Sequence, residues 1–186
     1  QDYLKTWSTK FDMEYGGSEG MPKFMMPNNL HFLLKYSYQT KNKEIQKFVE
    51  LSLEMMAFGG IYDQIGGGFS RYSVDNKWHV PHFEKMLYDN AQLISLYSDA
   101  YKLTKNSLYK NVVYETISFL NSELKDNSGG YYSSLDADSK TETNVLEEGA
   151  FYVWTKEELK KVLKEKFTLF SDYYNINEYG YWEDDK

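Results

Sequence analysis

The chain has 186 residues, enough for one domain with a sizeable core, and its net charge is −7 at pH 7. This acidic balance argues against a nucleic-acid binder, which needs a clustered cationic face, and against docking on anionic membranes. The absence of cysteine excludes disulfides and thiolate metal sites within the chain and fits a reducing compartment, so we expect a cytoplasmic protein.

Apolar periodicity predicts helices that follow one another in pairs, with glycine pairs between them. The expected helices cover residues 3–13, 27–41, 44–58, 82–103 and 107–124, a sixth that starts at the capping box Thr155–Glu158, and a short seventh near 169–174. Helix hairpins joined by loops rich in glycine and aromatic residues predict an all-α fold of the α/α-toroid type. An ordinary helix bundle is the alternative.

In an α/α toroid, inner and outer helices alternate around a central cavity, and the loops carry short β-hairpins. We expect residues 1–186 to form one partial toroid domain, because both ends look cut, which indicates a piece of a longer protein. Half a toroid leaves an open inner face, so the fragment is also expected to be able to associate with itself.

Residues 59–89, GGIYDQIGGGFSRYSVDNKWHVPHFEKMLYD, form the loop that carries most of the candidate chemistry. Alternating residues predict a hairpin within 65–74, and Pro81 predicts a helix that starts at His82. His82 and Glu84 would then lie in the first helical turn, with His82, Lys85 and Asp89 on one face.

Three residues of this loop are candidates for proton transfer. His79 and His82 are expected to act as general acid–base groups. Asp89 sits inside an otherwise apolar helix, which favours a role facing a cavity. The spacing of the two histidines resembles a metal pair, but Pro81 separates them and no third ligand lies at zinc-site spacing, so no metal is predicted.

Several charged residues of the loop have a competing structural interpretation. Arg71 is expected to bridge to Asp63 or Asp75 and to hold the loop rigid. Glu84 either caps the helix or faces the site, and the sequence leaves these two alternatives open.

A second polar loop covers residues 131–148. Asp136 and Asp138 form a carboxylate pair that could act as acid and base on a glycoside. Glu148 extends the same acidic rim. An EF-hand calcium loop is rejected, because Thr141 occupies the position that needs glycine.

Long stretches of the chain resemble a known family. They are FDMEYGG, PKF, the segment from Gly59 through YDNAQL, GGYYSSLDADS and EEGAFYVWT. They look like the thioredoxin-domain-containing family of the spermatogenesis-associated and YyaL type. The resemblance implies an N-terminal thioredoxin-like domain, absent from this cysteine-free chain, and a six-hairpin toroid like that of sugar epimerases and several glycosidases.

We therefore expect a carbohydrate-active domain, sugar epimerase-like or glycosidase-like, that uses no cofactor. The expected catalytic residues are His82, His79, Asp89, Asp136 and Asp138. The residues expected to contact a sugar-like ligand are Asp63, Arg71, Trp78, Glu84, Tyr88 and Glu148. The alternatives are a non-catalytic glycan- or peptide-binding module that accompanies a thioredoxin-like domain, and a purely structural domain.

Overall fold

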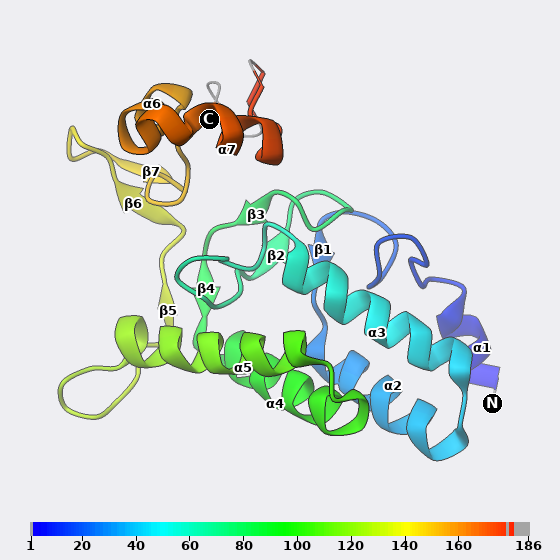
Figure 1. The fold of residues 1–186 in the computed structure, drawn as a ribbon. Coiled ribbons are helices and arrows are strands. Elements are labelled where there is room, and N and C mark those ends of the chain that lie inside the picture. The colour runs from blue at the N-terminus through cyan, green and yellow to red at the C-terminus, as the bar shows by residue number, and fades with distance from the viewer. Residues whose placement is uncertain (1, 178, 181–186) are drawn as a thin grey trace. The chain divides into compact units, whose positions relative to one another are not determined.

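The computed structural model describes residues 2–177, 179 and 180 (Figure 1). The chain divides into two compact units, Gln1–Ala137 and Asp138–Lys186. Among the described residues, none of the helices combines the length and the apolar character needed to cross a bilayer.

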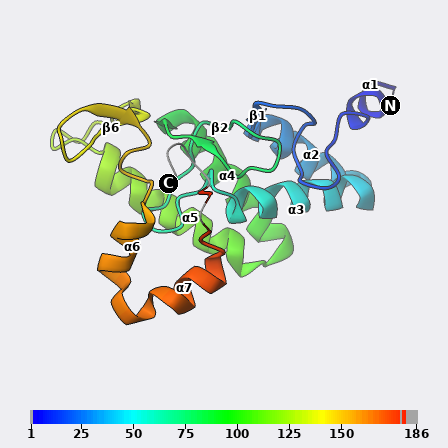
Figure 2. The same ribbon diagram turned by 90° about the horizontal axis from the view of Figure 1, so that it is seen from above.

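Helices dominate the first unit. They are α1 (Asp2–Ser8), α2 (Pro27–Thr40), α3 (Lys43–Phe58), α4 (Leu87–Thr104) and α5 (Ser107–Phe119), and α5 continues into a π-helical turn, η1 (Leu120–Leu124). Helix α2 packs against α3 and α4, and α4 packs against α5 (Figures 1 and 2). The expected pairs of helices are therefore confirmed.

Local sequence explains where these helices begin and end. Pro27 opens α2, and the side chains of Asn42 and Asn106 accept backbone N–H groups at the starts of α3 and α5. Helix α1 is shorter than predicted, because the chain turns after Ser8 and Phe11 forms an isolated bridge with Ser18.

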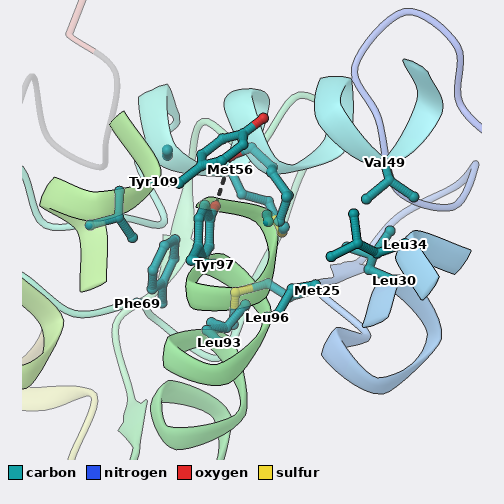
Figure 3. Packing of buried hydrophobic residues seen from close by; sticks show 14 of the residues in the cluster. Met25, Leu30, Leu34, Val49, Met56, Phe69, Leu93, Leu96, Tyr97 and Tyr109 are labelled. Atoms are coloured by element: carbon teal, nitrogen blue, oxygen red, sulfur yellow. Dashed lines mark hydrogen bonds between the residues drawn. The ribbon is translucent and has the colours of Figure 1, made fainter. Parts of the chain in front are cut away.

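The core of the first unit joins all four longer helices to the loop between α3 and α4 (Figure 3). Phe11 stacks on Phe48 with ring centroids 3.8 Å apart, and Tyr97 donates its hydroxyl to the carbonyl of Leu53 at 2.7 Å. From the loop, Ile61, Phe69 and Trp78 are fully buried in this core. The loop is thus anchored by its own aromatic residues.

Two small antiparallel sheets organise the loop. The first contains β1 (Lys23–Phe24), β2 (Tyr72–Ser73) and β3 (Pro81–His82) in that order, and the second pairs β4 (Lys85–Met86) with β5 (Ser134–Leu135). The predicted hairpin within 65–74 is wrong, because β2 pairs with β1 and β3. The predicted helix start at His82 is also wrong, because these two sheets engage the backbone up to Met86.

The second unit contains the hairpin β6 (Asp138–Lys140) and β7 (Leu146–Glu148), then α6 (Lys156–Leu163), a 3-10 turn η2 (Lys164–Lys166) and α7 (Phe167–Tyr174). The predicted capping box at Thr155 and Glu158 is confirmed. Val162 lies on α6 and is 63% exposed. Residues 149–152, between β7 and α6, form turns.

Candidate functional site

Five of the predicted residues come together where the two sheets meet the start of α4. We call Arg71, His82, Glu84, Tyr88 and Asp89 the acid–histidine cluster. Arg71 donates its backbone N–H to the carbonyl of Glu84 at 2.8 Å, and its Nη1 lies 3.0 Å from Glu84 Oε2. The side chains of Arg71 and Glu84 therefore lie in a fixed relation at the edge of the sheet.

The structure corrects the expected partners of Arg71. The predicted bridge to Asp63 or Asp75 is wrong, since both carboxylates are engaged elsewhere. Asp63 Oδ2 lies 2.8 Å from Lys85 Nζ, and Asp75 accepts backbone N–H groups of its own loop, among them those of Lys77 and Val80. Asp63 is thus a structural residue of the loop.

His82 is the last residue of β3, and its side chain lies near that of Glu84. Its ring stacks on Tyr72 with centroids 4.8 Å apart and an interplanar angle of 15°, and its Nε2 lies 3.8 Å from Glu84 Oε2. The stacking orients the imidazole, and about a quarter of the side chain stays exposed to solvent. Position and orientation suit proton transfer to a bound molecule.

Asp89 occupies the first turn of α4, where its carboxyl group is half-buried. Burial raises the pKa of Asp89 to about 6, and Glu84 adds to the rise, while Arg71 opposes it. Among the residues that the structure describes, none donates a hydrogen bond to this carboxylate. Asp89 can therefore hold and release a proton near neutral pH.

Asp136 directly follows β5, the strand that pairs with β4. In the β4–β5 pair, Lys85 stands opposite Leu135 and Met86 opposite Ser134. The pairing ends at Lys85 and Leu135, so the expected role of Asp136 in the site stays a prediction. Asp138 and Glu148 belong to the second unit, so their expected roles in the site stay predictions.

Trp78 is the clearest correction among the predicted ligand contacts. It is fully buried and donates its indole N–H to the carbonyl of Tyr15 at 2.8 Å, so it belongs to the packing of the loop. The face predicted to join His82, Lys85 and Asp89 is also wrong, because only Asp89 lies on a helix.

His79 is exposed in the loop before β3, and its backbone N–H donates a hydrogen bond to the carboxylate of Asp75. Its catalytic role and its partnership with His82 stay predictions. In the described part of the chain, no three histidine, aspartate or glutamate side chains gather closely enough to bind a metal ion.

A buried ion pair behind the site was missed from the sequence. Lys23 is fully buried, with Nζ 2.6 Å from Asp12 Oδ2, 2.9 Å from the carbonyl of Asn76 and 5.2 Å from the Trp78 ring. The signal was present, because Asp12 and Lys23 lie in the FDMEYGG and PKF stretches. Those stretches therefore stabilise the loop from beneath.

Sequence comparison finds relatives that are much longer than this chain. No family model matches. Spermatogenesis-associated protein 20 of Homo sapiens is 44% identical over 160 residues, and that of Mus musculus is 42% identical over the same length. In both, the match covers 83% of this chain and 20% of the relative. An uncharacterized protein of Caenorhabditis elegans is 39% identical over 187 residues, and this match covers 92% of this chain and 26% of that protein.

Structural comparison identifies the fold. Cellobiose 2-epimerase from Bacillus thermoamylovorans superposes with a TM-score of 0.62 at 14% identity, over 78% of this chain and 42% of that chain. A family 76 glycoside hydrolase from Bacteroides thetaiotaomicron gives 0.51 at 15% identity, over 81% and 33%. Both are α/α toroids, which confirms the predicted fold class and shows the fold alone.

Proposed function

We propose, for a chain homologous to spermatogenesis-associated protein 20 with an α/α-toroid fold, that the acid–histidine cluster is an acid–base site acting on a sugar. The observation that carries the proposal is Asp89, a half-buried carboxyl group whose pKa burial raises to about 6 close to the Arg71–Glu84 ion pair, and Glu84 in turn lies 3.8 Å from His82. Two solved toroids of this fold are a sugar epimerase and a glycoside hydrolase, which supports a sugar as the substrate class.

The residues have distinct roles in this proposal. For hydrolysis, Asp89 gives its proton to the glycosidic oxygen as the C1–O bond breaks, and His82 takes a proton from the water that attacks C1. For epimerisation, one of the two residues takes the proton from the carbon beside the carbonyl, and the other returns a proton to the opposite face of that carbon. Arg71 is 43% exposed and Tyr88 is also exposed, so both can donate hydrogen bonds to hydroxyl groups. Glu84 orients Arg71 and raises the proton affinity of Asp89.

The test uses the full-length protein with a panel of neutral mono- and disaccharides in D₂O, followed by NMR. Deuterium at the carbon beside the carbonyl reports epimerisation, and new reducing ends report hydrolysis. We expect Asp89→Asn to lower turnover by about 100-fold or more, since positioned acid–base groups contribute that much. Asp172→Asn, an exposed carboxylate on α7, is the matched control and should keep wild-type turnover.

Turnover by Asp89→Asn at the wild-type rate would overturn the proposed role of this residue.

The alternative is a non-catalytic glycan- or peptide-binding module beside a thioredoxin-like domain of the whole protein. The exposed donors of Arg71 and Tyr88 favour it, because they bind without chemistry. It predicts saccharide binding with no product from the wild type. We also propose a cytoplasmic setting, which suits a chain without cysteine.

A further inference from the structure

The outer face of the β1–β2–β3 sheet carries an aromatic side chain on every strand. In the register of the sheet, Phe24 stands opposite Tyr72, and Tyr72 stands opposite His82. The neighbouring residues of the three strands point the other way and are buried: Lys23, Ser73 and Pro81. Because side chains alternate along a strand, the three rings share the outer face. We call Phe24, Tyr72 and His82 the aromatic ladder.

The steps of the ladder are regular. The ring centroids of Phe24 and Tyr72 are 4.9 Å apart at an angle of 38°, and those of Tyr72 and His82 are 4.8 Å apart at 15°. Phe24 lies on an edge strand, so it has a ring neighbour within the sheet on one side, and it is 44% exposed. An aromatic ring this open at the end of a sheet is available to a ligand.

The ladder is continuous with the acid–histidine cluster. His82 belongs to both, with its ring on Tyr72 and its Nε2 3.8 Å from Glu84 Oε2. Tyr72 directly follows Arg71, the partner of Glu84. A molecule that extends from the cluster along the sheet therefore contacts the aromatic ladder, and Phe24 is the end of the ladder farthest from the cluster.

The chemistry of this surface selects the class of ligand. Aromatic rings pack against the C–H faces of pyranose rings, which are apolar although the rim of the sugar is hydroxylated. Two carboxylates, Glu84 and Asp89, lie in the cluster, and the chain as a whole carries a charge of −7. An anionic sugar is disfavoured beside these carboxylates.

We propose that the aromatic ladder is a second sugar subsite, with Phe24 holding the residue that is not at the cluster. The ligand is then an uncharged saccharide of at least two pyranose units. This assignment rests on the proposed function for the identity of the first subsite, since the cluster holds the other unit. The role of Phe24 is binding and specificity, and it takes no part in proton transfer.

The test compares cellobiose with glucose on the full-length protein, by NMR titration for binding and by KM and kcat for turnover. We expect Phe24→Ala to weaken cellobiose binding and to raise its KM by about tenfold, with kcat and glucose binding unchanged. Phe24→Leu keeps the apolar bulk without the ring and should show the same loss while preserving the sheet. Phe58→Ala is the control, since Phe58 is 70% exposed at the end of α3.

The outcomes separate this proposal from the proposed function. Equal effects of Phe24→Leu on cellobiose and glucose, or no binding of either saccharide by the wild type, would overturn the subsite. If Phe24→Leu weakens only cellobiose while Asp89→Asn leaves turnover intact, the subsite stands and the acid–base role of Asp89 fails. If Asp89→Asn abolishes turnover and Phe24→Leu changes nothing, the acid–base site stands and the subsite fails.

Discussion

Lys85 and Asp89 lie four residues apart, and burial shifts the pKa of each toward the neutral form, but only Lys85 has an ion-pair partner within 3 Å among the described residues. Burial lowers the pKa of Lys85, but Asp63 opposes this effect through an ion pair at 2.8 Å. The pKa of Asp63 is lowered overall, because the Lys85 hydrogen bond and the backbone N–H groups of Gly66 and Ile65 outweigh its burial. Asp89 has no such partner in the described chain, so its environment favours the neutral acid.

Asp89 is half-buried without an ion-pair partner in the described chain, and this predicts how the free energy of unfolding depends on pH. Its pKa of about 6 in the folded protein exceeds the value of 3.8 for an unperturbed aspartate. Below pH 3.8, Asp89 is protonated in both the folded and the unfolded protein, and its contribution to the free energy of unfolding is fully present. This contribution is lost as the pH rises through 6. Asp89→Asn, always neutral, should therefore be more stable than the wild type at pH 8, and the difference should shrink at pH 5.

Urea unfolding of the full-length protein at pH 5 and pH 8 measures this difference. Asp172→Asn serves again as the control, because its carboxyl is exposed on α7. Stability curves of Asp89→Asn and wild type that stay parallel across this range would contradict the unpaired, half-buried state of Asp89.

At the scale of elements, the glycine run before β2 fits against α5 too closely for a side chain. Gly67 has φ of +76°, and a Cβ atom on it would lie 2.6 Å from the backbone carbonyl oxygen of Glu115. Gly129 has a similar φ of +92°, but a Cβ atom there would meet nothing within 4 Å. The two glycines separate the effect of backbone conformation from that of crowding.

Replacing these glycines by alanine should give unequal losses of stability. Gly129→Ala should cost about 1–2 kcal/mol for the left-handed backbone alone. Gly67→Ala adds a clash with backbone that cannot rotate away, so we expect a loss of more than about 3 kcal/mol. Denaturant unfolding of the full-length protein measures both, and equal losses would refute the close approach of the loop to α5.

The helices could be predicted, whereas the strands of the site could not. Periodic apolar residues are a local signal, and they predicted α2, α3 and α5; the caps Asn42 and Asn106 that the structure shows are local features as well. Residues 82–86 continue the apolar spacing of α4, but β3 pairs with β2, and β4 pairs with Ser134 and Leu135. Such pairing comes from distant parts of the chain, and a local pattern does not contain it.

The cluster shows the same division. The sequence placed Arg71, His82, Glu84, Tyr88 and Asp89 among the candidates, and the structure brings them together, although their roles stay predictions. Burial was the missing information for the others. The sequence pattern of an aromatic residue in a glycine-rich loop is the same whether the residue contacts a ligand or is buried in the core, as Trp78 is.

At the scale of the whole molecule, burial is concentrated in the first unit. All the buried hydrophobic residues of the described chain lie in Gln1–Ala137. Within the described residues of Asp138–Lys186, Gly149 alone is buried. The described residues of the second unit therefore have backbone hydrogen bonds and a capping box, but they form no core among themselves.

Hydrogen exchange of the full-length protein should reflect this contrast. We expect the amides of α3 and α4 to exchange slowest, through global unfolding, because their inward faces are buried. Amides of α6 and α7 should exchange at least about 100-fold faster if nothing else in the full-length protein covers them. Equal protection would show that another part of the full-length protein supplies the second unit with a core.

The contacts beneath the site have a consequence for the order of folding. Trp78 reaches Tyr15 across 63 positions of the chain, and Lys23 reaches Asn76 across 53. Closing such long loops is entropically costly until the intervening helices α2 and α3 have paired and drawn the ends together. The second sheet also needs Ser134 and Leu135. During synthesis, the frame of the acid–histidine cluster thus stays incomplete until β5 has left the ribosome.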